Sequence, residues 1–181
     1  MNPERADVLA FWFQELTPED WYRKDPELDQ AIADRFDITH RAAMNAELFD
    51  WRETVHGRLA EIIVLDQFSR NIFRDSPQAF ASDGMALVLA QEACRSSETA
   101  NLSPEERAFL YMPFMHSESR AIHDVALSLF SKPGMETNLQ FELSHKAIID
   151  RFDRYPHRNA ILGRCSTAEE IDFLQQEGSS F

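Results

Sequence analysis

Apolar side chains recur along this 181-residue chain at the spacing of α-helices. In the longest stripe they fall at i, i+4, i+8, i+11 and i+15, which places them on one face of a helix. These residues are Leu28, Ile32, Phe36, Thr39 and Ala43. Similar stripes lie within 122–129 and 141–152, and no stretch shows the sustained alternation typical of strands. The pattern predicts an all-helical (all-α) protein.

About eight main helices are predicted from these stripes and from the start signals between them. They cover residues 3–15, 26–44, 54–72, 78–96, 104–115, 118–131, 138–153 and 167–176. A capping side chain precedes a proline at three predicted starts, namely Thr17–Pro18, Asp25–Pro26 and Ser103–Pro104. Ser103 with Glu106, and Ser166 with Glu169, have the spacing of a capping box. Pro113 is expected to end or kink its helix, because proline lacks the N–H that the helix needs.

The connections between most of these helices are short, so successive helices are expected to pack as antiparallel neighbours. Such packing produces either a bundle or a solenoid of helical pairs. No low-complexity linker divides the chain. We therefore expect residues 1–181 to form a single all-helical domain.

Composition narrows the possible partners. The chain has 18 Lys and Arg against 31 Asp and Glu, a net charge of −13, which disfavours nucleic acid and anionic lipid as partners. With only 5 Gly and 2 Cys, it has no glycine-rich nucleotide loop and no cysteine pattern for a structural metal. No apolar run is long enough to span a bilayer. We expect a cytoplasmic protein without a cofactor, a metal or a membrane partner.

Three blocks are more specific than this general helical pattern. They are LDQFSRNIFR at 65–74, FLYMPFMHSE at 109–118 and RFDRYPHRNAILGR at 151–164. Together with Phe11–Trp12–Phe13 and the terminal Gly-Ser-Ser-Phe at 178–181, they resemble the bacterial family called domain of unknown function 924. The resemblance covers essentially the whole chain. It implies an all-helical fold related to tetratricopeptide repeats, with helical hairpins in a right-handed superhelix or bundle, and it implies no activity.

Asp66 is the first candidate for a special role. It lies on the apolar stripe that includes Leu59, Ile62 and Phe73, so its carboxylate is expected to be a buried structural charge. A buried carboxylate requires a partner, and Arg70 lies at i+4 on the same face. Asp66 is interpreted either as part of a structural ion pair or cap, or as a group that orients a ligand-binding arginine.

The arginines suggest a binding site. Arg70 and Arg74 share one helix face, so two guanidinium groups can reach one carboxylate or phosphate. Residues 141–164 carry five basic and three acidic side chains, a basic segment in an acidic chain. The predicted ligand-binding residues are Arg70, Asn71, Arg74, Arg151, His157 and Arg158. We expect them to converge on one groove for an acidic peptide, a C-terminal carboxylate or a small anion. The alternative is that the arginines pair with acidic residues of the same chain.

Two other functions remain open. An enzyme, for example a hydrolase, would use His116, Glu118 and His145 as general acid–base groups. His116 and Glu118, together with His145 or His157, can form a two-histidine, one-carboxylate metal site, although no spacing in the sequence requires one. His145 lies on an apolar stripe, which is more typical of a core histidine. The last alternative is a structural or oligomerising helical protein. The binding module is the leading hypothesis, and the enzyme and the structural protein are the alternatives to it.

Overall fold

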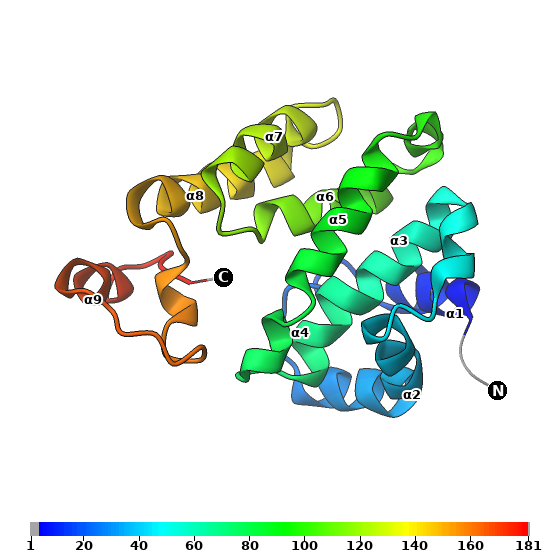
Figure 1. The fold of residues 1–181 in the computed structure, drawn as a ribbon, viewed down its shortest axis with the longest axis horizontal. Coiled ribbons are helices and arrows are strands. Elements are labelled where there is room, and N and C mark those ends of the chain that lie inside the picture. The colour runs from blue at the N-terminus through cyan, green and yellow to red at the C-terminus, as the bar shows by residue number, and fades with distance from the viewer. Residues whose placement is uncertain (1–3, 181) are drawn as a thin grey trace. The chain divides into compact units, whose positions relative to one another are not determined.

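The computed structural model describes residues 4–180, and no strand occurs in this range. The α-helices are α1 (Arg5–Ala10), α2 (Pro26–Met44), α3 (Val55–Ile63), α4 (Ser69–Ile72), α5 (Asp83–Cys94), α6 (Pro104–Met115), α7 (Arg120–Phe130), α8 (Glu136–Phe152) and α9 (Ala168–Leu174) (Figure 1). Two π-helical turns, Phe11–Glu15 and Val64–Phe68, extend α1 and join α3 to α4. Short 3-10 turns occupy Phe49–Glu53, Pro77–Phe80, Ser97–Asn101 and Pro156–Arg158. The prediction of an all-helical fold is confirmed.

Two predicted helix starts have the expected chemistry. The Asp25 side chain accepts hydrogen bonds from the amides of Glu27 and Leu28, and α2 begins at the following proline. At α6, the Ser103 hydroxyl accepts from the Glu106 amide at 3.2 Å, and Glu106 accepts from the Ser103 amide at 2.8 Å. Both helices have the bounds that the caps predict, because each cap satisfies amides that no helical carbonyl can reach.

Other local predictions were wrong. The capping box of α9 pairs Thr167 with Glu170, one residue beyond the predicted pair of Ser166 and Glu169. Both pairs have the spacing of a capping box. Glu170 also binds Arg154, and this tertiary contact favours the cap formed by Thr167 and Glu170. The Thr17 hydroxyl and amide do bind Asp20, at 2.7 and 2.8 Å, but they close a turn and no helix follows.

Of the two outcomes expected at Pro113, an end of the helix is not found, and a kink stays a prediction. Helix α6 passes through Pro113 and ends two residues later, at Met115. A proline this close to a C-terminus removes a single hydrogen bond from the last turn, so the helix can continue for a few residues. The predicted helix over 3–15 is found as α1 and its π-helical turn, and residue 3 lies outside the described residues, as does Phe181 of the terminal block.

The described residues form two compact units. The N-terminal unit contains residues up to Arg74 and Gln78–Pro113, and the C-terminal unit contains Asp75–Pro77 and the residues from Phe114 onward. The expectation of a single domain stays a prediction. No helix in the described range is both long enough and apolar enough to cross a membrane.

In the N-terminal unit, the segment from α3 to α4 is the central element. Leu59 to Phe68 is buried on all sides, as the sequence predicts for a helix packed between neighbours. It contacts α1, α2 and α5. Aromatic rings fill the space around it, with the Phe36 and Phe68 ring centroids 4.8 Å apart and those of Trp12 and Phe109 5.4 Å apart.

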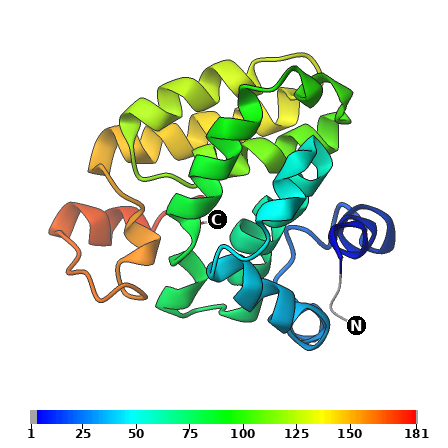
Figure 2. The ribbon, with the colours of Figure 1, turned by 45° about the vertical axis from the view of Figure 1, so that its right-hand side comes forward.

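In the C-terminal unit, α7 and α8 lie side by side as a helical hairpin, visible in both Figure 1 and Figure 2. Helix α8 ends at Phe152 and is capped by Asp153, which has a left-handed backbone conformation with a φ of 57°. The chain then passes through Tyr155 and a 3-10 turn to α9. A small core forms here from Ile148, Ile149 and Tyr155, with Phe152 and Phe173 packed against it.

Candidate functional site

In the N-terminal unit, Asp66 is fully buried beside Arg70. The Nη1 of Arg70 lies 3.0 Å from Asp66 Oδ1 and 2.9 Å from Oδ1 of Asp83 on α5. Arg70 also donates to the backbone carbonyl of Asp66 at 2.7 Å, and Gln67 donates to its carboxylate. The buried carboxylate and its arginine therefore join the central segment to α5.

Arg74 and Asn71 reach a different carboxylate, that of Asp29 on α2. Asn71 Nδ2 donates to Asp29 Oδ1 at 2.8 Å, and Arg74 binds both carboxylate oxygens. Arg70 and Arg74 thus do not share one carboxylate, although their i, i+4 spacing allowed it. An incoming anion would have to displace Asp29, so an anion site at these residues stays a prediction.

The substitution Asp66→Ala is expected to lower the free energy of unfolding by about 3 kcal/mol, as breaking a buried ion pair usually does. Arg70 keeps Asp83, but the buried amide of Gln67 keeps only the weak Met112 sulfur as an acceptor, and a cavity remains. The control is Asp37→Ala, which removes an exposed i, i+4 pair with Arg41 and is expected to cost less than about 0.5 kcal/mol. Urea unfolding at pH 7 measures both, and an equal loss in the two variants would contradict the structural role of Asp66.

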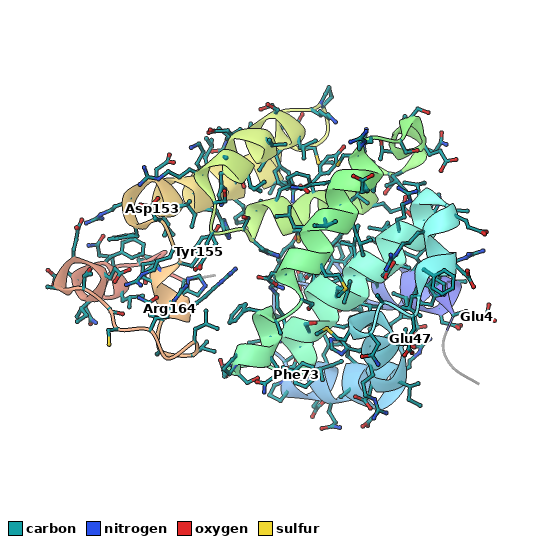
Figure 3. All side chains as sticks on the ribbon, viewed as in Figure 1. Glu4, Glu47, Phe73, Asp153, Tyr155 and Arg164 are labelled. Atoms are coloured by element: carbon teal, nitrogen blue, oxygen red, sulfur yellow. The ribbon has the colours of Figure 1, made fainter. Side chains whose placement is uncertain are left out.

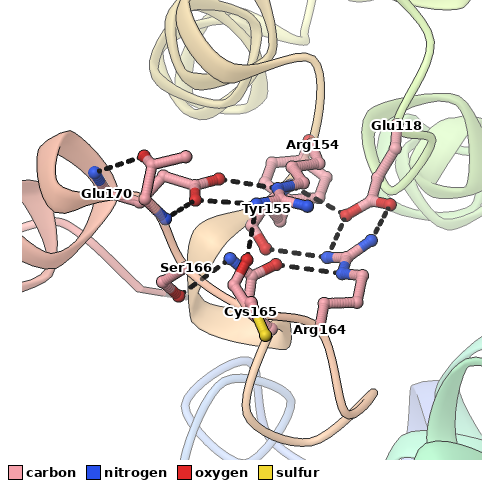
Figure 4. A network of polar contacts seen from close by, with 9 residues as sticks. Glu118, Arg154, Tyr155, Arg164, Cys165, Ser166 and Glu170 are labelled. Carbon is pink, nitrogen blue, oxygen red and sulfur yellow. Dashed lines mark hydrogen bonds and ion pairs between the residues drawn. The ribbon is translucent and has the colours of Figure 1, made fainter.

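Two arginines of the C-terminal unit, Arg154 and Arg164, are paired with carboxylates from other segments (Figure 4). Arg154 binds both oxygens of Glu170 at 2.6 and 2.7 Å, and this hydrogen bonding lowers the pKa of Glu170 to about 2. Arg164 binds Glu118 at 2.6 and 2.9 Å. Burial opposes ionisation of Glu118, but hydrogen bonds from Arg164 and from the Tyr155 amide lower its pKa overall. Glu118, expected as a catalytic acid in the enzyme alternative, is therefore a structural ion-pair partner in this arrangement.

Tyr155 is the centre of a second cluster, in the segment after α8 that also contains Arg164 (Figure 3). Its buried hydroxyl donates to the Met115 carbonyl at 2.5 Å and lies 3.2 Å from Nε2 of His123. The ring lies 5.7 Å from that of His145 and 5.5 Å from that of His157, measured between centroids. Arg158, expected to bind a ligand, is buried with its guanidinium 4.6 Å from the centre of the Tyr155 ring.

His145 has the character of a core histidine. Its Nδ1 lies 2.8 Å from the Phe141 carbonyl, so this nitrogen carries the proton and donates it. Burial lowers the pKa of His145 to about 3, although the Phe141 hydrogen bond acts in the opposite direction. The imidazole is therefore neutral at physiological pH, and such a weak base suits a structural role better than proton transfer. His116 contributes to this low pKa as a nearby like charge.

Sequence reasoning missed a buried pair formed by His123 and Glu142. Both side chains are fully buried, and Nδ1 of His123 lies 2.7 Å from Oε1 of Glu142. The other ring nitrogen contacts the Ser117 carbonyl at 2.8 Å. Burial raises the pKa of Glu142, against the effect of its bond to His123. The sequence does contain a signal for the burial of Glu142. It precedes His145 by three residues and Ile149 by seven, so it lies on the same buried face of α8.

A hollow on the surface lies between the end of α8 and the start of α9. We call it the α8–α9 hollow, and its lining residues are Arg151, Phe152, Asp153, Arg154, Thr167, Glu169 and Glu170. Arg151, a predicted ligand-binding residue, has its guanidinium 4.7 Å from the ring centre of Phe152 and 5.7 Å from that of Phe173. It forms an ion pair with Glu169 at 2.8 Å.

The structure places the predicted binding residues in both units. Arg70, Asn71 and Arg74 belong to the N-terminal unit, whereas Arg151, His157 and Arg158 belong to the C-terminal unit. Their convergence on a single groove stays a prediction. Within the described part of the chain, no group of three or more His, Cys, Asp or Glu side chains is arranged to hold a metal ion.

The fold and these side-chain networks define an all-helical protein in which ion pairs join side chains from different helices. A model of the bacterial family of unknown function DUF924 matches residues 8–178, so the chain belongs to this family. A solved structure of the protein of unknown function ATU0120 from Agrobacterium tumefaciens is similar, with a TM-score of 0.90 and 38% sequence identity. The match covers 94% of this chain and 96% of that one. No curated protein matches the chain.

Proposed function

We propose that this protein is a cytoplasmic, tetratricopeptide-like binding module that takes its ligand through a carboxylate at the α8–α9 hollow. The ligand is an acidic peptide, a C-terminal carboxylate or a small anion, and Arg151 is the anchoring residue. The observation that carries this proposal is the position of Arg151, stacked beside two phenylalanine rings and facing the hollow.

Exposure distinguishes Arg151 from the other candidate arginines. Its side chain is 45% exposed, whereas those of Arg70 and Arg74 are 20% and 27% exposed and Arg158 is buried. Its partner Glu169 is 63% exposed, whereas Glu170, which binds Arg154 in the same hollow, is only 3% exposed. An ion pair between solvent-exposed side chains contributes about 0–1 kcal/mol. A ligand carboxylate can therefore replace Glu169 on Arg151 at little cost, while replacing Glu170 on Arg154 would break a bidentate pair and a helix cap.

The acid–base alternative has less support. Its proposed base, His145, is neutral and buried, and its proposed acid, Glu118, is bound to Arg164 and to the Tyr155 amide. Neither arrangement presents a titratable group to a substrate. The binding proposal uses a charged side chain that solvent already reaches.

The test is the melting temperature in the presence of N-acetyl-L-phenylalanine, which offers one carboxylate and one aromatic ring. Because a ligand that binds only the folded state stabilises it, we expect millimolar concentrations to raise the melting temperature of the unaltered protein. The Arg151→Gln variant is expected to show no such rise. The matched control is Arg41→Gln on α2, which also removes an exposed, ion-paired arginine and should retain the full rise. A rise that persists in Arg151→Gln would overturn the proposed site.

A further inference from the structure

The charges around the α8–α9 hollow favour a ligand that carries a positive charge beside its carboxylate. Two arginines and three carboxylates line it, so the lining carries a net charge of −1. A ligand with only negative charge would meet Arg151 but also the repulsion of Glu169, the carboxylate that it displaces, whereas Asp153 is paired with Arg120 at 2.7 Å. A ligand with a carboxylate and a nearby cation would satisfy both kinds of group.

We propose that the ligand of the α8–α9 hollow is a zwitterionic amino acid with an apolar, preferably aromatic, side chain. This inference rests on the proposed function and specifies the class of its ligand. The ligand carboxylate binds Arg151, and the ligand ammonium binds Glu169, the carboxylate released from Arg151. The exposed ion pair between Arg151 and Glu169 is thereby replaced by two ion pairs between the protein and the ligand.

The geometry of the Arg151–Glu169 pair supports this exchange. Arg151 Nη2 lies 2.8 Å from Glu169 Oε1, and the two side chains come from different helices, α8 and α9, that both line the hollow. The α-carboxylate and α-ammonium of an amino acid are joined through a single carbon. A ligand that bridges Arg151 and Glu169 therefore needs only a modest separation of these two side chains.

The rest of the hollow is fixed by stronger contacts. Arg154 binds both oxygens of Glu170, and Arg154 also donates to the Cys165 carbonyl at 2.9 Å. Glu170 and Thr167 complete the capping box of α9. Because these contacts need not break when a ligand binds, the hollow is largely formed beforehand, which reduces the entropic cost of binding.

An apolar surface lies next to the ion pair of Arg151 and Glu169. The rings of Phe152 and Phe173 have centroids 5.1 Å apart, and both side chains are half-buried against Ile148, Ile149 and Tyr155. An aromatic side chain of a ligand would extend this cluster, and aromatic pairs at such distances are favourable beyond the area that they bury. Glycine and polar amino acids lack this contact and are expected to bind more weakly.

Isothermal titration calorimetry with three probes tests the inference. L-Phenylalanine has both charges, N-acetyl-L-phenylalanine has only the carboxylate, and L-phenylalaninamide has only the ammonium. We expect L-phenylalanine to bind at least tenfold more tightly than either of the others. In Glu169→Gln, the preference for L-phenylalanine over its N-acetyl derivative is expected to fall below threefold. The control Glu177→Gln, at an exposed position after α9, should retain the full preference.

The possible results separate this inference from the proposed function. If both carboxylate probes bind with equal affinity and both require Arg151, the carboxylate site stands and the zwitterion inference is overturned. A preference that survives in Glu169→Gln also overturns it, because the ammonium would then bind elsewhere. If neither carboxylate probe binds, or if binding survives Arg151→Gln, the proposed function and this inference both fail.

Discussion

Replacing Tyr155 with alanine is expected to lower the free energy of unfolding by about 3–5 kcal/mol, the usual cost of removing a buried aromatic ring. The ring contacts His123, His145 and His157, so the substitution leaves a cavity where three segments of the C-terminal unit meet. It also deprives the Met115 carbonyl of its hydrogen bond. Urea unfolding followed by circular dichroism measures the loss.

The control for Tyr155→Ala is Tyr155→Phe, which keeps the ring and removes only the hydroxyl. The expected loss is about 1–2 kcal/mol, because a buried carbonyl loses its donor but no large cavity forms. If the alanine variant were no less stable than the phenylalanine variant, the ring would not be part of the core.

Acidification from pH 7 to pH 4 is expected to destabilise the protein through His145, by up to about 3 kcal/mol. The pKa of His145 is about 3 in the folded state, while the pKa of an unfolded histidine is about 6.5. Between these values the unfolded chain binds a proton that the folded chain does not. The contribution of neutral His145 is therefore fully present above pH 6.5 and is lost progressively as the pH falls toward 3. Urea unfolding at several pH values measures this slope.

The variant His145→Gln provides the comparison for this pH dependence. Glutamine does not titrate, so the stability of this variant should fall less steeply than that of the unaltered protein between pH 6.5 and pH 4. Parallel slopes for the His145→Gln variant and the unaltered protein would show that His145 titrates normally in the folded state.

The helices could be predicted from the sequence where local chemistry decides their ends. Asp25 and Ser103 cap α2 and α6 with side chains from the same few residues, so the sequence contains all the information required. At α9 two pairs, Ser166–Glu169 and Thr167–Glu170, have the spacing of a capping box. The second pair forms the cap, because Glu170 also binds Arg154, sixteen residues earlier in the chain. At Thr17 a cap formed without a helix, and the Trp21 side chain in this turn donates to the Trp12 carbonyl.

The ionic partners were less predictable, because they come from distant parts of the chain. The stripe that contains Asp66 indicated its burial, and the i+4 spacing indicated Arg70. The partner of Arg74, however, is Asp29, 45 residues away, and no sequence pattern connects them. The pair of His123 and Glu142 was missed for the same reason, since their contact depends on how α7 packs against α8.

The contacts of Glu118 have a consequence for the order in which the C-terminal unit folds. Glu118 binds Arg164, 46 residues later, and the Tyr155 amide, 37 residues later, so both contacts close long loops. The α7–α8 hairpin requires only short-range contacts and can form first. The segment from Tyr155 to α9 would then dock after the α7–α8 hairpin and open before it, as a separate cooperative element. The α8–α9 hollow would therefore be completed only after the α7–α8 hairpin has formed.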